Sequence, residues 1–215
     1  AVNHAIDRDR IIRLISGRGV VANGVLPPGM PGFNEHLKGY DFNPEKARQL
    51  LLEAGYKDGF KTELMIVAQN STETKIGQAV QQDLERVGIT LELKPVTGAT
   101  RIEALGHRKT VPFGTFGWYQ DYPDPSNFLD VLLNGRRITD INSNNVSFYN
   151  NEKVNSLLEE AAFITDQNRR LGLYQEAEEI IVDEAPWVFL YHPNMYILRQ
   201  VWLKGLKLNP VWPIR

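Results

Sequence analysis

Trp118-Tyr-Gln-Asp-Tyr-Pro-Asp-Pro-Ser-Asn-Phe-Leu129 separates two predicted elements of this chain. The stretch follows an apolar run at residues 111–118 and contains two prolines. Each proline lacks a backbone donor and fixes φ at about −65°. The residue before each proline is also pushed toward an extended conformation. The pattern therefore predicts that a strand ends near Trp118 and that a helix begins near Pro125 or Ser126.

Two carboxylates, Asp121 and Asp124, then lie in the turn that follows a strand. In α/β proteins this edge of the sheet is where ligands usually bind. Aromatic rings beside a carboxylate suit a cation flanked by apolar groups. The simpler interpretation is that Asp124 caps the helix while Trp118 and Phe128 join the core. We adopt the simpler interpretation for Asp124 and Phe128, and for Asp121 both interpretations stay open.

Helical and extended segments alternate on the amino-terminal side of this turn. The pattern predicts a loop at 18–42, helices at 1–17, 43–55, 71–88 and 101–107, and strands at 61–68, 89–94 and 111–118. Asp7 can cap a second helical segment within residues 1–17, and Asn43 and Ser71 or Thr72 can cap the next two helices. This order predicts an α/β fold with a mixed, mainly parallel sheet flanked by helices.

Two amphipathic helices are predicted after a polar loop at residues 134–146. The first has one apolar face, formed by Val154, Leu157, Leu158, Ala161 and Ala162. The second begins at an Asp166 cap and ends at Pro186. Residues 187–191 and 195–201 are then predicted to be two closing strands.

The composition excludes several classes of protein. A chain of 215 residues fits one large α/β domain or two small ones. Its 24 basic and 26 acidic residues give a net charge of −2, so no basic field favours nucleic acid. No apolar run reaches the roughly 20 residues of a membrane helix. The chain begins at Ala1 without a Met, so we expect a piece of a longer chain from which an export signal can have been lost.

Motifs for catalysis or metal binding are missing from the sequence. The four histidines have no metal-ligand spacing, and the chain contains neither a Gly-x-Ser-x-Gly motif nor a phosphate-binding Walker loop. Asp121 and Asp124 are too close in one turn to face opposite sides of a glycosidic bond. Pro123 and Pro125 exclude a calcium-binding EF-hand loop. We therefore predict no catalytic residues, no metal and no cofactor.

Four blocks of sequence together resemble one family of transport proteins. They are Ala1-Val-Asn-His-Ala-Ile-Asp-Arg8, the predicted helix at 43–55, Trp118-x-x-Asp121-Tyr-x-Asp-Pro125-x-x-Phe128-Leu129, and residues 166–186. They are similar to the dipeptide/oligopeptide-binding family, the family 5 solute-binding proteins of ABC importers. The resemblance implies a type II periplasmic-binding-protein fold, in which two α/β lobes enclose a cleft. Family members are more than twice as long, so residues 1–190 would form the second lobe, and residues 191–215 would return toward a missing first lobe.

The resemblance also implies a binding site. Asp121 occupies the position at which peptide-binding relatives pair with the α-ammonium group of the ligand, and we expect its carboxylate to be desolvated at the rim of the sheet. Trp118 would line a side-chain pocket, with Tyr119 or Tyr122 beside it. Dipeptide-selective relatives carry an arginine in the loop after the first strand of this lobe. This chain has Gln69-Asn70-Ser71 there, so longer peptides or another solute, such as an oligosaccharide, are favoured over strict dipeptide binding.

The implied function is that of a binding protein rather than an enzyme. Its partners would be a peptide or other small solute, an ABC permease and the missing lobe, with no nucleic acid. The full-length protein would be periplasmic or anchored to the cell surface as a lipoprotein. Two alternatives of other classes are a hydrolase that acts on sugars with Asp121 as its acid, and a regulatory ligand-sensing module. Binders of metal chelates in the same family tend to lack the Asp, which disfavours that branch.

Overall fold

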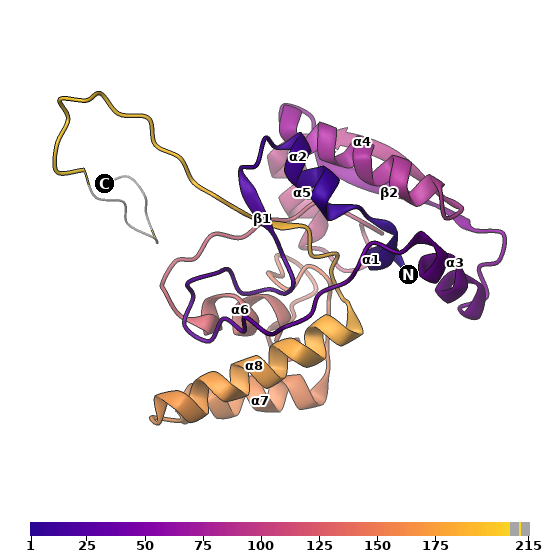
Figure 1. Cartoon of the computed structure of the whole chain (residues 1–215). Helices are drawn as coiled ribbons and strands as arrows, with labels where there is room; N and C mark the ends of the chain where they lie inside the picture. Colours follow the sequence, from indigo (N-terminus) through magenta and orange to yellow (C-terminus); the bar gives the residue numbers. More distant parts are fainter. Residues whose placement is uncertain (207–210, 212–215) are drawn as a thin grey trace.

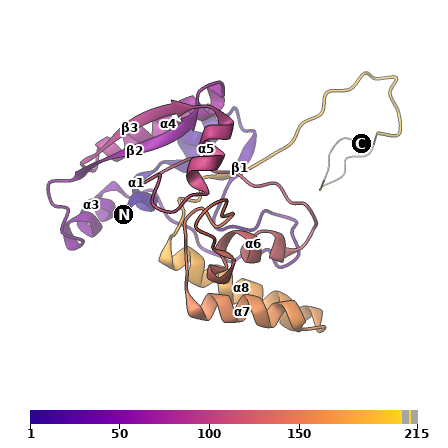
Figure 2. The ribbon, with the colours of Figure 1, turned by 180° about the vertical axis from the view of Figure 1, so that it is seen from behind.

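The chain builds two neighbouring units, each with its own hydrophobic core. The computed structural model describes residues 1–206 and residue 211. An α/β unit contains most of the amino-terminal half, and a helical unit contains the last long helices (Figure 1). Seen from both sides, residues 194–206 extend away from the two units (Figures 1 and 2).

The α/β unit is organised around a parallel pair of strands, β2 (Phe60–Val67) and β3 (Ile89–Val96). Helix α4 (Ser71–Glu85) connects them and covers one face of the pair (Figures 1 and 2). The apolar positions of both strands and of α4 share one buried core. The opposite face is polar, and Lys94 there forms ion pairs with Glu63 and Glu92.

Short helices complete this unit close to the predicted positions. They are α1 (Val2–Ala5), α2 (Arg8–Leu14), α3 (Pro44–Glu53) and α5 (Gly98–Leu105). The predicted caps are confirmed at Asp7, which accepts a hydrogen bond from the Arg10 amide, and at Asn43, which accepts one from the Lys46 amide. Helix α5 begins earlier than predicted because Thr97 caps it.

The predicted strand at residues 111–118 is wrong. A single parallel bridge joins Gly114 to Met65 of β2, and the segment otherwise runs as a loop beside that strand. Pro112 lacks the donor that a ladder needs, and two glycines weaken the segment further. The predicted parallel direction nevertheless holds at the bridge. Because the segment runs parallel to β2, its last residue, Trp118, lies at the edge of the sheet at which β2 ends.

The helical unit begins directly after the quoted turn. Its elements are η1 (Pro125–Asn127), α6 (Leu129–Leu133), η2 (Gly135–Arg137), α7 (Glu152–Phe163) and α8 (Gln167–Glu184). The predicted start near Pro125 and the Asp166 cap are confirmed. Helices α7 and α8 lie side by side beneath α6 (Figures 1 and 2). Phe128 is buried in this core, as predicted.

A short antiparallel pair joins the two ends of the chain. Strand β1 (Gly19–Val21) pairs with β4 (Tyr191–Pro193). Strand β1 lies in the predicted loop, and the two predicted closing strands are wrong: β4 spans only three residues, and residues 195–201 form no strand. These strands exist only where the distant partner lies, and local sequence does not show that. Residues 207–210 and 212–215 of the predicted return segment lie outside the described residues.

Candidate functional site

The turn at residues 118–124 is organised by one buried amide, that of Asn127. Asn127 is 1% exposed, and its Oδ1 accepts a hydrogen bond from the Trp118 indole at 2.9 Å. The same oxygen accepts one from the backbone amide of Asp121 at 3.0 Å. The indole ring and the start of the turn are thereby fixed to η1. The sequence analysis missed Asn127, although a buried polar residue in a tight turn is a plausible organiser.

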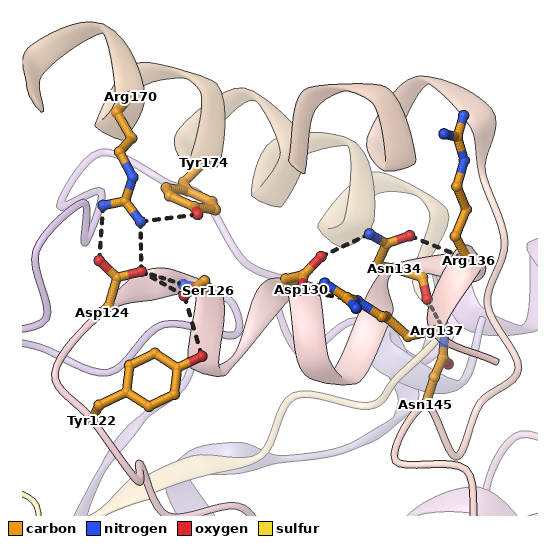
Figure 3. Close-up of polar contacts among 10 residues, drawn as sticks. All are labelled: Tyr122, Asp124, Ser126, Asp130, Asn134, Arg136, Arg137, Asn145, Arg170 and Tyr174. Carbon is orange, nitrogen blue, oxygen red and sulfur yellow. Dashed lines mark hydrogen bonds and ion pairs between the residues drawn. The ribbon is translucent and has the colours of Figure 1, made fainter. Parts of the chain in front are cut away.

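Asp124 has a structural role that makes the turn rigid. It caps η1 by accepting from the Ser126 amide at 3.0 Å, as predicted. Its two oxygens also accept from Arg170 of α8, both at 2.8 Å (Figure 3). Partial burial alone would raise the pKa of Asp124, but the bonds from Arg170 and Ser126 outweigh burial and lower it to about 2. A carboxyl group with this pKa cannot serve as a general acid near neutrality.

Asp121 presents its carboxylate to solvent. The residue is exposed, and among the described residues no Lys, Arg or His forms an ion pair with it. Our expectation that this carboxylate is desolvated is therefore wrong for this chain by itself, because residue 121 is exposed in the part of the chain that the structure describes. Its backbone amide is nevertheless held by Asn127, which fixes the main chain from which the carboxylate projects.

Aromatic rings at the start of the same turn, together with Trp187, form an aromatic wall. Phe116 stacks on Trp118 with ring centroids 6.3 Å apart, and it also contacts Trp187 at 5.9 Å. Trp118 is half-buried and packs against the helical core, as the simpler interpretation predicted. Tyr119 and Tyr122 are 69% and 44% exposed. Such rings offer apolar surface with polar tips to a ligand.

The loop after β2 carries the two other predicted residues, Gln69 and Asn70, and both are exposed. Asn70 caps α4 by accepting a hydrogen bond from the Glu73 amide at 3.1 Å. The predicted caps, Ser71 and Thr72, are therefore wrong. Asn70 is the last residue before the helical backbone begins, and its short amide reaches the free amide three residues on. No hydrogen bond or ring contact among the described residues joins this loop to the turn.

A polar cluster lies at the edge of the sheet where β2 ends. Glu73 Oε1 accepts from the Val67 amide at 2.8 Å, from Arg101 at 2.9 Å and from the Thr115 hydroxyl. Burial raises the pKa of Tyr191, and the charges of Tyr119 and Glu73 raise it further. Tyr191 therefore lies near both this cluster and the aromatic wall. Sequence reasoning missed the cluster because its members come from separate elements.

Two hollows in the described part of the chain lie away from the predicted ligand residues. One, of about 310 Å³, is lined by residues that include Tyr40 and Lys46, and another, of about 290 Å³, lies beside Arg136 and Phe163. None of the six predicted ligand residues lines either hollow. Within residues 1–206 and 211, no group of His, Asp and Glu side chains could hold a metal ion. No helix in that same part of the chain has the length and apolar character to cross a bilayer.

Comparisons with known proteins relate this chain to transport-associated binding proteins. The sequence profile of the bacterial extracellular solute-binding proteins, family 5 middle, matches residues 1–140. Heme-binding protein A of Haemophilus influenzae is 34% identical over 220 residues, and the match covers 98% of this chain and 39% of that protein. The dipeptide-binding protein of Escherichia coli is 28% identical over 218 residues, with 98% and 40% covered.

Solved structures show the same relationship at the level of the fold. The ABC transporter-associated periplasmic binding protein DppA of Helicobacter pylori, in complex with the peptide STSA, superposes with a TM-score of 0.82 and 32% identity. This match covers 89% of the chain and 37% of that structure. The chain thus spans about two fifths of the length of the relatives it matches. Its architecture is that of one α/β lobe of a periplasmic binding protein, as the sequence predicted.

Proposed function

Because this chain belongs to the bacterial extracellular solute-binding proteins of family 5, we propose that it supplies one lobe of a protein that binds peptides for an ABC importer. Residues 1–190 form this lobe. Residues 191–215 return toward the other lobe, which the rest of a longer protein supplies. The solute lies between the lobes, and its binding closes them about the hinge.

The observation that carries the proposal is the exposed carboxylate of Asp121 on a backbone that Asn127 holds. An ammonium group needs an unpaired carboxylate, and Asp121 has no ionic partner among the described residues. Trp118, Tyr119 and Tyr122 give apolar and polar surface beside it. When the second lobe covers the turn, this charge is desolvated, so pairing with the α-ammonium group of a peptide contributes affinity.

The loop after β2 bears on the length of the peptide that the site prefers. Gln69 and Asn70 are exposed and uncharged, so the loop after β2 supplies no guanidinium group at the position where dipeptide-selective relatives have one. The amide of Asn70 is also engaged in capping α4. Peptides longer than two residues are therefore favoured over strict dipeptides, with their main chain held by hydrogen bonds and their side chains tolerated in pockets. An oligosaccharide is the alternative solute within the same arrangement.

The exposed segment after β4 supports the two-lobe arrangement. Leu198, Val201 and Trp202 are 99%, 92% and 75% exposed. Apolar side chains gathered on one extended segment need a partner surface, and the other lobe supplies it in this proposal.

The assembled protein works outside the cytoplasm, in the periplasm or anchored to the cell surface as a lipoprotein. Its closed form docks on the membrane permease.

A hydrolase is disfavoured by the state of the second carboxylate. Both oxygens of Asp124 accept hydrogen bonds from Arg170, so this carboxylate is not free to act as the nucleophile or base beside Asp121. We therefore propose a binding protein rather than an enzyme. A sensing module would use the same site, and a signalling domain in the longer protein would reveal that role.

Calorimetric titration of the two-lobed protein tests the proposal. The ligands are alanine peptides of two to five residues with free amino ends, their N-acetylated counterparts, and hemin as the competing solute suggested by one relative. We expect N-acetylation or Asp121→Asn to weaken binding about 10- to 100-fold, since a hydrogen bond to a charged group contributes about 1.5–3 kcal/mol.

The matched control is Asp58→Asn, an exposed carboxylate before β2 at the opposite end of that strand. This substitution should leave the affinity unchanged. Equal affinity for free and N-acetylated peptides, or binding of hemin alone, would contradict the proposal.

A further inference from the structure

The dipeptide Asn-Gly occurs twice in this chain, at Asn23-Gly24 and at Asn134-Gly135. In such a pair the backbone nitrogen of the glycine can attack the side-chain carbonyl of the asparagine, because glycine has no Cβ to hinder the approach. The attack needs a glycine nitrogen and an asparagine carboxamide that are not held by other hydrogen bonds. The two pairs differ in this respect.

The pair at Asn134 is held at both reacting groups. The side chain of Asn134 is buried, donates from Nδ2 to Asp130 at 2.7 Å and accepts at Oδ1 from the Arg136 amide at 2.9 Å (Figure 3). The Gly135 amide donates to Oδ1 of the buried Asn155 at 2.7 Å. The attack at this pair therefore requires that three hydrogen bonds open first.

The pair at Asn23 is held at neither group. Asn23 is exposed and lies in the loop after β1, and neither its side chain nor the Gly24 amide forms a hydrogen bond within the described residues. The next two amides, of Val25 and Leu26, both donate to Glu178 Oε1 at 2.7 Å. The loop is therefore anchored on α8 directly after the pair, while the pair itself is free to react.

We propose that Asn23 is a site of spontaneous deamidation, whereas the hydrogen bonds of Asn134 protect it from the same reaction. The Gly24 nitrogen loses its proton to solvent hydroxide and attacks Cγ of Asn23. The bond from Cγ to the carboxamide nitrogen breaks, and this nitrogen takes a proton from water and leaves as ammonia. Water then opens the resulting succinimide ring at either carbonyl, which leaves aspartate or isoaspartate at position 23.

The tight packing of Gly24 gives the reaction a structural consequence. Isoaspartate adds a methylene group to the main chain directly before Gly24. A Cβ on Gly24 would lie 2.6 Å from Glu178 Oε1 and 2.6 Å from a methyl carbon of Leu37, so the main chain has little room to shift. We therefore expect the isoaspartyl form to lose part of the contact between this loop and α8, and to unfold at a lower urea concentration than the unmodified protein.

Peptide mapping by mass spectrometry measures both pairs in one sample of the two-lobed protein, incubated at mildly alkaline pH. We expect Asn23 to react about 100-fold faster than Asn134, because three hydrogen bonds of ordinary strength must open at Asn134. In urea that unfolds the protein, the two rates should become similar. Asn23→Gln should abolish the reaction at this pair, since the longer side chain would have to close a larger ring, and its urea midpoint should not change on incubation.

Three results would count against the proposal. Similar rates at the two pairs in the native protein, or no reaction at Asn23, would overturn it. A slow reaction at Asn134 in urea as well would show that neighbouring residues in the sequence, and not the hydrogen bonds of the fold, protect Asn134. If the isolated isoaspartyl form unfolds at the same urea concentration as the unmodified protein, the loss of contact with α8 is overturned while the assignment of Asn23 stands.

Discussion

For Asp124, the sequence predicted one of two structural roles: the cap of η1 was predicted, and the ion pair with Arg170 was not. Its role as an N-cap follows from its place before Pro125, which local sequence shows. Its partner Arg170 lies on α8, separated by a long stretch of chain, and only the fold reveals it (Figure 3). The same limit applies to Asn127 and Arg101, whose roles depend on distant neighbours. Residue types and local spacing therefore predicted the turn but not what holds it.

Replacing Asp124 tests the ion pair without removing the cap, since Asn also caps helices well. We expect Asp124→Asn to lower the free energy of unfolding at pH 7 by about 2–3 kcal/mol, because Arg170 is left partly buried without its partner. The pair contributes fully above pH 3.8, the usual pKa, and its contribution is lost as the pH falls toward about 2. Urea unfolding measures this loss. The control Asp140→Asn, in an exposed pair, should cost less than about 1 kcal/mol.

Glu178 on α8 predicts a pH dependence of the opposite sign. Burial raises its pKa from 4.5 to about 7, although the amides of Leu26 and Val25 donate to Oε1 and partly offset this. The folded state therefore favours the protonated form. Stability from this group is fully present below pH 4.5 and is lost as the pH rises through about 7.

Comparing native protein with Glu178→Gln isolates this effect. Between pH 4.5 and 7 the unfolding free energy of the native protein should fall relative to the variant by on the order of 2–3 kcal/mol. Gln keeps the acceptor for both amides and cannot ionise. Parallel curves of unfolding free energy against pH for the two proteins would show that folding does not raise the pKa of Glu178.

At the scale of elements, helices with capping residues and the parallel strands β2 and β3 were predicted well, whereas β1, β4 and the segment 111–118 were not. Asn43, Pro44 and Asp166 mark helix starts by local chemistry, which needs no tertiary information. The strands β1 and β4 exist because they meet each other across most of the chain. The segment 111–118 fails as a strand because Pro112 and its glycines cannot sustain a ladder.

Helix α4 allows a test of the two roles of Asn70. If Asn70 acts only as a cap, Asn70→Ala should lower stability by about 1 kcal/mol, and Asn70→Ser should restore it. If it also contacts solute, both variants should weaken peptide binding by the two-lobed protein. Urea unfolding and calorimetry on the same samples give the two readouts. Asn43→Ala on α3 is the matched control, with the same loss of stability and no effect on binding.

At the scale of the whole molecule, a buried arginine ties the two ends of the chain together. Arg8 donates to backbone carbonyls of Asn3, Tyr40 and Phe189 and has no carboxylate partner among the described residues. Burial lowers its pKa, although the nearby Tyr40 opposes this. The segments it joins lead into the lobe at residue 1 and out of it after residue 189. In the proposed two-lobed protein, we expect Arg8 to lie at the base of the hinge.

Replacing Arg8 should therefore affect both stability and closure. We expect Arg8→Met to lower the unfolding free energy by about 3–5 kcal/mol, since several buried carbonyls lose their donor. Small-angle scattering of the folded variant with peptide should show a smaller compaction than the native protein. If the variant is as stable as the native protein, water replaces the guanidinium group. If the variant compacts as much as the native protein when peptide binds, Arg8 has no role in the hinge.

The resemblance in four sequence blocks predicted the family and the lobe, which the comparisons show. It could not predict that Asp121 is exposed in this chain alone, because in our proposal the other lobe covers it. The most direct test is a crystal structure of the two-lobed protein with a bound alanine peptide. The account predicts the α-ammonium nitrogen within about 2.7–2.9 Å of an Asp121 carboxylate oxygen. A peptide whose amino end contacts another residue while Asp121 faces solvent would contradict it.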